Sequence, residues 1–123
     1  MFNDQTPIYR QIADQIRQDI LTGRLNEEEQ VMSTNQYASF YRINPATAQK
    51  AFQSLVDDGV LYKKRGIGMF VVSGAKEKLQ LEHRERFFEE ILEPMLTEAR
   101  AIGIAEGDLI EYITSNYAAG ETT

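Results

Sequence analysis

Residues 44–57, NPATAQKAFQSLVD, constrain the fold more than any other stretch of this chain. Asn44 is a favourable helix N-cap, and Pro45 suits the first helical position because its missing N–H costs nothing there. Gly59 suits the left-handed position just beyond a helix end. At about 100° per residue, one side of this helix is apolar. That stripe consists of Ala48, Ala51, Phe52 and Leu55. The segment is therefore expected to form a helix that buries one face.

The opposite face of the expected helix contains no carboxylate before Asp57. Its members are Ala46, Gln49, Lys50 and Gln53. A helix face that is merely solvated usually mixes acidic and basic residues. Glutamine and lysine can instead hydrogen-bond to base edges in the DNA major groove, and nothing here would repel phosphate. This face is therefore a candidate DNA-reading surface.

Two further helices are expected before residue 44. In the first, the isoleucines at 8, 12, 16 and 20 give an apolar face, with Thr6 as cap, Pro7 in the first turn and Gly23 at the end. A capping box of Ser33 and Gln36 begins the second, which runs to about residue 41. The second helix is expected to bury Tyr37, Ala38 and either Phe40 or Tyr41. With a turn at 42–43, this order predicts a helix-turn-helix.

The residues after Gly59 predict a β-hairpin with a basic tip. Segments 60–62 and 69–72 are apolar and β-prone, and the stretch KKRGIG at 63–68 lies between them. Glycines in the tip allow positive φ and close approach to a ligand. A basic wing directly after a helix-turn-helix predicts a winged helix whose tip reaches the minor groove or its phosphates. The alternative is a solvated hairpin whose lysines only protect its edges.

Taken together, residues 7–72 resemble the GntR-type winged-helix domain of bacterial transcription regulators. The resemblance is carried by PIY-QI, NP-T--KAF and RG-G-FV, and the short tail is similar to that of the YtrA-like subgroup, whose members are dimeric. Thr47, Lys50, Arg65 and Gly68 match the family pattern. The family's Pro-Ser-x-Arg run is replaced by Met32 to Asn35, so a DNA-contacting arginine becomes an asparagine, which donates hydrogen bonds but has no charge. Gln49 stands at a variable position and is a candidate for specificity.

The expected DNA-binding residues therefore come from both helices and the wing. They are Ser33, Asn35, Arg42, Asn44, Ala46, Thr47, Gln49, Lys50, Gln53, Lys63, Lys64, Arg65, Gly66 and Gly68. The net charge of −6 does not oppose this assignment, because residues 1–75 carry eight basic and eight acidic side chains. Residues 76–123 carry five basic and eleven acidic side chains, so the acidic excess lies in the tail.

The tail is expected to be a helix from about 76 to 101, which Pro94 kinks or divides after Glu93, and a last helix over about 106–117. Its apolar stripe is too extensive to stay exposed, so a second copy of the chain is the expected cover. The expected dimerisation residues are Phe88, Ile91, Leu92, Met95, Leu96, Ala99, Ile102, Leu109, Tyr112 and Ile113. Packing against the chain's own winged helix is the alternative, and a ligand pocket at the dimer seam stays open.

The expected fold is mainly α with a small hairpin wing: a winged helix-turn-helix over 1–75 and a two-helix dimerisation tail over 76–123. The expected function is a cytoplasmic homodimeric regulator, a repressor, that binds double-stranded DNA at an inverted repeat. A small-molecule effector and a DNA-free protein-interaction module are the alternatives. The sequence lacks cysteine, a nucleophile motif, metal-ligand spacing and a membrane-length apolar run, and its lone His83 stands among charges. No enzyme, cofactor or metal is therefore expected.

Overall fold

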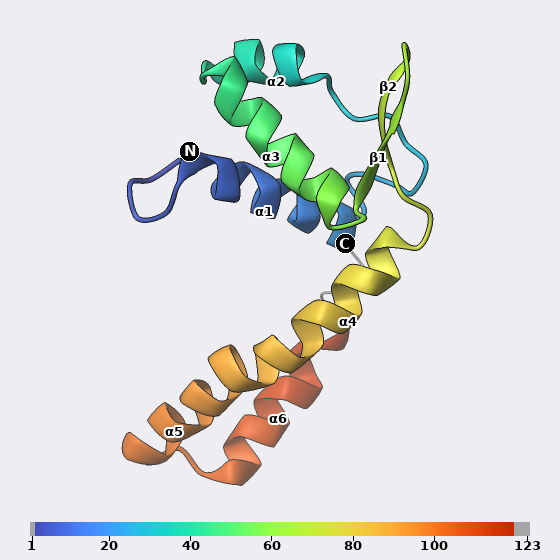
Figure 1. Cartoon of the computed structure of the whole chain (residues 1–123). Coiled ribbons are helices and arrows are strands. Elements are labelled where there is room, and N and C mark those ends of the chain that lie inside the picture. The colour runs from blue at the N-terminus through green and yellow to red at the C-terminus, as the bar shows by residue number, and fades with distance from the viewer. Residues whose placement is uncertain (1, 120–123) are drawn as a thin grey trace. The chain divides into compact units, whose positions relative to one another are not determined.

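The computed structural model describes residues 2–119 and divides into two compact units, Met1–Glu82 and His83–Thr123. The first unit contains the helices α1 (Ile8–Leu21), α2 (Thr34–Tyr41) and α3 (Pro45–Asp57) and a hairpin of β1 (Leu61–Lys64) and β2 (Gly68–Val71) (Figure 1). Helix α4 (Ala75–Phe87) begins in the first unit and ends in the second. The π-helix η1 (Phe88–Leu92), α5 (Glu93–Ala101) and α6 (Glu106–Asn116) complete the described chain. The expected mainly helical fold with a hairpin wing is confirmed.

The core of the first unit lies where α1, α2 and α3 meet the base of the hairpin. The predicted stripe of α3 is buried in full, and Phe52 is 1% exposed. Tyr37 of α2 packs its ring edge-on against Phe52, with the two ring centroids 5.5 Å apart. Ala75 and Leu79 belong to the same core, so the first turns of α4 pack with the winged helix. This burial holds α3 by one face and leaves its other face to solvent.

The start of α1 differs from the sequence expectation, because Thr6 is not its cap. Pro7 occupies the N-cap position and no side chain caps the helix. The Gln11 side chain instead donates to the carbonyl oxygens of Asn3 at 2.7 Å and Thr6 at 2.8 Å. Its own carbonyl oxygen accepts from the Asn3 N–H at 3.0 Å. The side-chain amide of Gln11 therefore fixes the residues that lead into α1, a role that the sequence assigns to the Thr6 hydroxyl.

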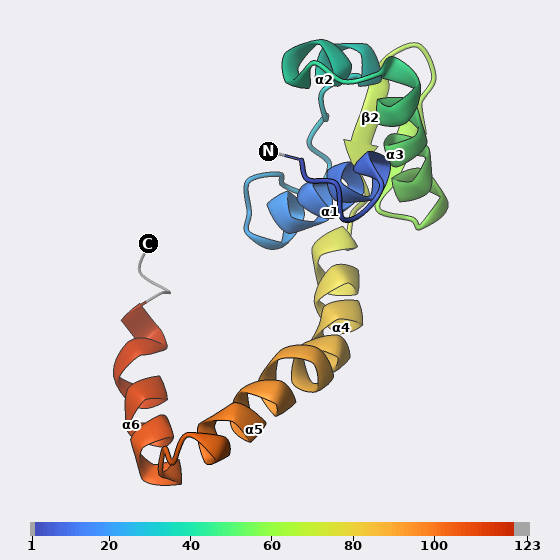
Figure 2. The same cartoon turned by 90° about the vertical axis from the view of Figure 1, so that its left-hand side faces the viewer.

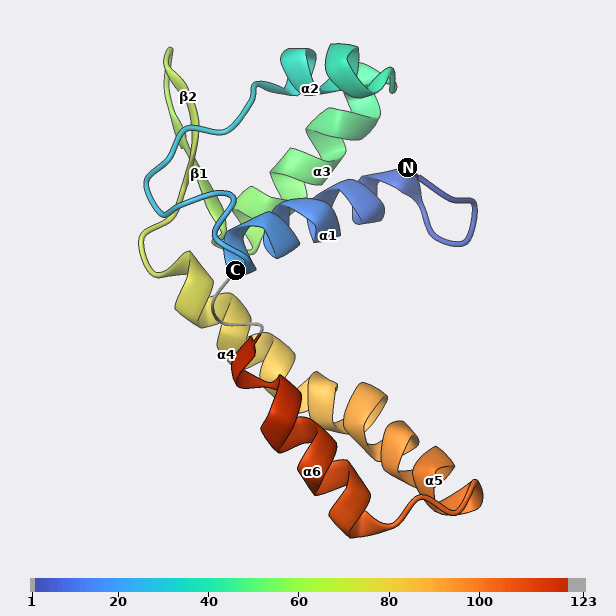
Figure 3. The ribbon, with the colours of Figure 1, turned by 180° about the vertical axis from the view of Figure 1, so that it is seen from behind.

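The wing is a two-stranded antiparallel hairpin in which Leu61 pairs with Val71 and Lys64 with Gly68. The segment between α1 and α2 runs beside it, as seen from behind in Figure 3. The N–H of Val31 donates to the Met69 carbonyl at 2.9 Å, and backbone bonds join residues 28 and 29 to Val71. The backbone of the exposed acidic stretch between α1 and α2 is thus hydrogen-bonded to the wing.

Pro94 interrupts the long C-terminal helix, as expected, but the interruption precedes Glu93 instead of following it. Proline has no N–H, and its ring would collide with the carbonyl of Glu90 in a regular α-helix. The chain widens into η1, where the Glu93 N–H donates to the Phe88 carbonyl five residues back. The helical chain bends at this point (Figure 2).

The second unit buries very little of its own apolar surface. Ala99 is buried at 5% exposure, whereas large side chains on η1, α5 and α6 remain in solvent. Exposed members of the predicted stripe are Phe88, Ile91, Met95, Ile102, Tyr112 and Ile113, and half-buried members are Leu92, Leu96 and Leu109. Within residues 2–119, no helix is both long and apolar enough to cross a lipid bilayer.

Candidate nucleic-acid interface

The outer face of α3 is presented by caps and packing that the sequence encodes locally. The Asn44 side chain accepts a hydrogen bond from the Ala46 N–H at 2.8 Å, with Pro45 in the first turn. Gly59 has a φ of +74° just beyond the helix. The expected outer residues are all exposed, namely Ala46, Gln49, Lys50 and Gln53, and Thr47 is half-buried beside them. The structure therefore brings the predicted α3 residues together on one accessible surface.

The two glutamines on this surface differ in their freedom. The Gln53 amide donates to the Asp57 carboxylate at 2.9 Å, which occupies one of its hydrogens. No hydrogen bond to the Gln49 side chain is found within the described residues 2–119. Gln49 is thus the freer amide for a base edge.

Helix α2 contributes its N-terminus and the turn that follows it. The predicted capping box is present, because Ser33 Oγ accepts from the Gln36 N–H and the Gln36 side chain accepts from the Ser33 N–H, both at 3.1 Å. Asn35 is exposed in the first turn, where free backbone N–H groups favour an anion. Arg42 caps the other end at a φ of +55°, a left-handed conformation, with its side chain in solvent. Ser33 and Asn35 therefore lie at the beginning of α2, and Arg42 lies at the turn into α3.

The wing carries exposed Lys63 and Lys64 at the end of β1 and exposed Arg65 and Gly66 in the turn, so the strands extend further into the basic stretch than the expected 60–62 and 69–72. Lys64 Nζ lies 4.4 Å from the centroid of the Phe70 ring, a cation–π contact that holds this side chain along the strand. Gly66 has a φ of +79°, as a tight turn at the tip requires.

Gly68, another wing candidate, is favoured by its backbone conformation and by its close approach to Gln30. Its φ is +147°, and a Cβ at this position would lie 2.6 Å from Gln30 Nε2. The Gln30 amide itself donates to the Ile67 carbonyl at 3.1 Å. Gln30 therefore supports the wing tip from the segment before α2. Sequence reasoning missed this residue, and no local pattern points to it.

The tyrosine at the base of the wing is tied to the same segment. The Tyr62 hydroxyl donates to the Glu28 carboxylate at 2.5 Å. This hydrogen bond raises the pKa of Tyr62 above its usual value, because the carboxylate accepts the proton that ionisation would remove. Through this hydrogen bond, Glu28 connects the segment between α1 and α2 to strand β1.

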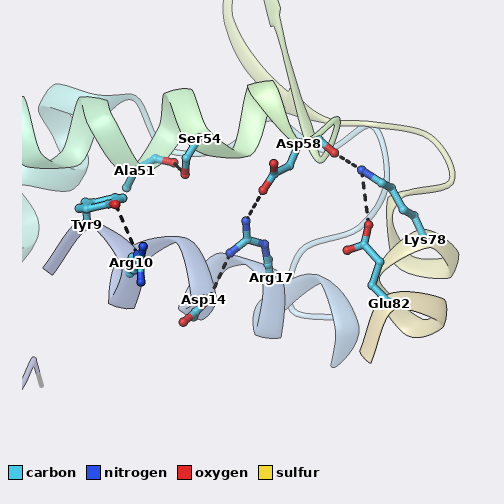
Figure 4. Close-up of polar contacts among 9 residues, drawn as sticks. All are labelled: Tyr9, Arg10, Asp14, Arg17, Ala51, Ser54, Asp58, Lys78 and Glu82. Carbon is cyan, nitrogen blue, oxygen red and sulfur yellow. Dashed lines mark hydrogen bonds and ion pairs between the residues drawn. The ribbon is translucent and has the colours of Figure 1, made fainter. Parts of the chain in front are cut away.

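Polar contacts anchor the C-terminal end of α3 to its neighbours (Figure 4). Arg17 of α1 reaches the Asp58 carboxylate at 2.6 Å and the Asp14 carboxylate at 3.0 Å. Lys78 of α4 donates to the Asp58 carbonyl oxygen and lies 3.7 Å from the Glu82 carboxylate. These contacts fix where α3 ends over α1, and hence how its outer face is presented.

The basic candidates differ from Arg17 and Lys78 in that they have no acidic partner. Among residues 2–119, the ion pairs found involve Arg17 and Lys78 and none of Arg42, Lys50, Lys63, Lys64 or Arg65. Exposed cations without an acidic partner and exposed side-chain amides are the groups that donate hydrogen bonds to DNA phosphates. The arrangement suits a nucleic-acid backbone flanking a base-reading helix.

Comparison with known proteins matches this geometry. The model of the family described as bacterial regulatory proteins, gntR family, matches residues 8–71. The HTH-type transcriptional repressor YtrA of Bacillus subtilis is 30% identical over 108 residues, covering 88% of this chain and 82% of that protein. A GntR-family transcriptional regulator from Bacteroides thetaiotaomicron has a similar structure, with 34% identity, a TM-score of 0.67, and coverage of 93% of this chain and 98% of that one.

A structure with DNA is also similar to the first unit. The DNA-binding domain of AraR in complex with operator ORX1 covers 58% of this chain and 93% of that one, with 26% identity and a TM-score of 0.55. That structure places a winged helix of this kind on operator DNA.

Proposed function

Because the chain belongs to the GntR family of DNA-binding transcription regulators, we propose that it acts as a homodimeric repressor on an inverted-repeat operator. The observation that carries this proposal is the outer face of α3, where, among residues 2–119, Gln49 has no side-chain hydrogen bond and Lys50 has no acidic partner, and which lacks a carboxylate before Asp57. In this proposal α3 enters the major groove, and the wing tip follows the phosphates into the neighbouring minor groove. The family consists of transcription regulators rather than enzymes.

The roles we assign follow the chemistry of each side chain. Thr47 and Gln49 read base edges, whereas Lys50, Arg42, Lys63 and Lys64 neutralise phosphates. Arg65 serves the wing tip. The remaining proposed contacts to DNA come from Ser33, Asn35, Asn44, Ala46, Gln53, Gly66 and Gly68. The predicted alternative of a DNA-free interaction module gives way to the family assignment.

Dimerisation is supported by the apolar side chains that the second unit leaves in solvent. Ile91 is 57% exposed and Phe88 is 52% exposed, and further apolar side chains extend this surface along α5 and α6. Monomeric proteins rarely expose contiguous apolar patches of large extent. A second copy covers such a surface with two-fold symmetry, and a symmetric dimer reads a symmetric operator. We therefore divide the roles between DNA binding over 1–75 and dimerisation over 76–123.

Repression is supported by the name of the relative YtrA, a transcriptional repressor. A dimer bound across a promoter occupies the groove that RNA polymerase needs, which requires no further activity of the chain. The protein would act in the bacterial cytoplasm, where the chromosome lies.

Control by a small ligand is the second candidate function. A hollow between α5 and α6 favours it, since apolar side chains there surround one cation and one carboxylate. The hollow is lined by Leu96, Ala99, Arg100, Ile104, Glu106 and Leu109. Such a site would place a ligand next to the proposed dimer seam.

The experiment that tests the main proposal is selection of bound duplexes from a random DNA library, at about 100 mM salt so that nonspecific contacts are screened. We expect enrichment of an inverted repeat whose half-sites lie about 10 bp apart or a multiple of it. Enrichment of a single half-site would contradict the dimeric reader. Binding without enrichment would favour a missing ligand, and no binding even at low salt would overturn the proposal.

Two substitutions separate the proposed roles on α3. Lys50→Ala should weaken binding to every sequence and reduce the slope of log Kobs against log salt by about 0.9, because one phosphate contact is lost. Gln49→Ala should leave the slope unchanged and relax base preference at one operator position. An unchanged slope in the first variant, or unchanged preferences in the second, would remove that residue from its role.

A further inference from the structure

Tyr9 of α1 packs its ring against the ammonium group of Lys50 in α3. Lys50 Nζ is 4.2 Å from the centroid of the Tyr9 ring, and the Tyr9 hydroxyl accepts a hydrogen bond from Arg10 Nε at 3.4 Å. Tyr9 also lines a surface hollow together with residues of α3. The α3 members of that hollow are Ala46, Gln49, Lys50, Gln53, Ser54 and Asp57. Tyr9 thus contacts Lys50 of α3 through its ring and Arg10 of α1 through its hydroxyl, beside the candidate DNA-binding face.

The two arginines of α1 shown in Figure 4 have opposite surroundings. Arg17 is neutralised by Asp14 and Asp58 and holds α1 against the end of α3. Arg10 is exposed, and within residues 2–119 it has no acidic partner. Its contact is the Tyr9 hydroxyl, whose pKa falls below the usual value because Arg10 donates to it and both Arg10 and Lys50 bring positive charge. Helix α1 therefore carries Arg17, which stabilises the packing of α1 on the end of α3, and Arg10, which remains available to an anion.

We propose that Tyr9, Arg10 and Lys50 form a phosphate-binding site for the DNA backbone, in which Tyr9 is a positioning residue. The ring restricts the Lys50 side chain by a cation–π contact, and the hydroxyl restricts Arg10. A long basic side chain loses rotamer freedom when it binds, so holding it beforehand reduces that cost. Helix α1 then takes part in DNA binding instead of serving only as scaffold.

The charges on this surface place the phosphate at the Tyr9 end of the hollow. The opposite end carries the Asp57 carboxylate, which accepts from the Gln53 amide and would repel a phosphate. Two cations without an acidic partner among residues 2–119 and a hydroxyl at one end, with a carboxylate at the other, favour phosphate binding at the Tyr9 end. The site adds a backbone contact and reads no base.

The test measures affinity and salt dependence of the full chain on its selected operator, and so it rests on the proposed function. Arg10→Ala should reduce the salt slope by about 0.9 and weaken binding roughly eightfold at 100 mM salt, because one phosphate contact is lost. Its matched control is Arg17→Ala, which should lower the stability of the fold and leave the salt slope unchanged. Equal slopes in the two variants would overturn the role of Arg10.

A double-mutant cycle tests the positioning role of Tyr9. Tyr9→Leu should weaken binding about threefold in the wild-type background, whereas in the Lys50→Ala background the same change should cost only the contact to Arg10, a loss no larger than that of Tyr9→Phe. Tyr9→Phe keeps the ring and should stay within about twofold of wild type. If Tyr9→Leu weakens binding equally in both backgrounds, Tyr9 does not act through Lys50 and the positioning role is wrong. If it strengthens binding, the ring withholds Lys50 from DNA and the proposal is equally overturned.

Failure of this proposal is distinguishable from failure of the proposed function. A wild-type chain that selects an operator while the Arg10 and Tyr9 variants keep wild-type slopes would overturn the α1 site alone. A wild-type chain that binds no duplex at low salt would overturn both. Circular dichroism and urea unfolding of each variant show whether a lost contact or a lost fold explains the change.

Discussion

The two units use amphipathic helices in opposite ways. In the winged-helix unit, the apolar stripe of α3 is buried and its polar face is in solvent, with Phe52 1% exposed. In the C-terminal unit, η1 exposes its apolar stripe as well as its acids, with Ile91 57% exposed. In the first unit, α1, α2, α3, the hairpin and the start of α4 surround one core that buries the α3 stripe. The second unit does not bury its stripe in this way.

This difference shows what amphipathic periodicity can predict. It indicates that an apolar helix face will be covered, but not whether the same chain or a second copy covers it. The winged-helix unit covers the α3 stripe with its own elements, and the polar outer face of α3 is the one we propose for DNA. The C-terminal unit places an apolar surface where a second copy of the chain can cover it. The acidic excess of the tail also keeps this unit from competing with the wing and α3 for phosphate.

The largest effect is expected where the first unit buries its stripe. Phe52→Ala removes the centre of the core and should lower the free energy of unfolding by about 3–5 kcal/mol, measured by urea denaturation. Phe40→Ala is the matched control, because Phe40 is 70% exposed, and it should change the free energy by about 0.5 kcal/mol or less. Similar losses in the two variants would show that the first unit is not built around the α3 stripe.

The next effect tests the exposed stripe of the second unit. Ile91→Glu places a charge in the proposed seam of both subunits and should weaken dimerisation at least about 100-fold, measured by sedimentation equilibrium. Glu90→Gln changes the neighbouring residue and should leave the association constant unchanged. A monomeric wild-type chain, or an Ile91→Glu variant that dimerises normally, would contradict the assignment of this surface.

The smallest effect concerns a defect inside the well-packed unit. Among the described residues 2–119 the buried Tyr37 hydroxyl has no hydrogen-bond partner, and burial raises the pKa of Tyr37 to about 12. Above pH 10 the unfolded chain ionises this group while the folded chain resists, so wild-type stability should fall by about 2 kcal/mol as the pH rises from 10 to about 12. Tyr37→Phe should remove that part of the alkaline loss and raise stability at neutral pH by about 1 kcal/mol.

The control for this variant is Tyr112→Phe, because Tyr112 is 71% exposed. Its unfolding free energy should follow the wild-type pH profile. A Tyr37→Phe chain that loses stability in parallel with wild type between pH 10 and 12 would show that another group is responsible.

Sequence alone was sufficient where the contacts are local. The Ser33 capping box, the Asn44 cap with Pro45, the buried stripe of α3 and the presence of a hairpin with a glycine-containing turn all depend on residues a few positions apart. Short-range hydrogen bonds and the helical period follow from residue order, so these features are readable without a structure. Family motifs within the same residues identified the DNA-binding unit.

Tertiary structure decided the contacts between residues distant in sequence. Gln30 fills the space above Gly68, Tyr9 lies under Lys50, and Arg17 holds Asp58 across two helices. Residue order does not specify these pairs, because each depends on how separate elements pack. The same reason explains the error at Thr6, where a Gln11 amide from the next turn replaced the local cap, and the position of η1 before Pro94. Local chemistry determined the elements and their outer faces, and packing determined which side chains support those faces.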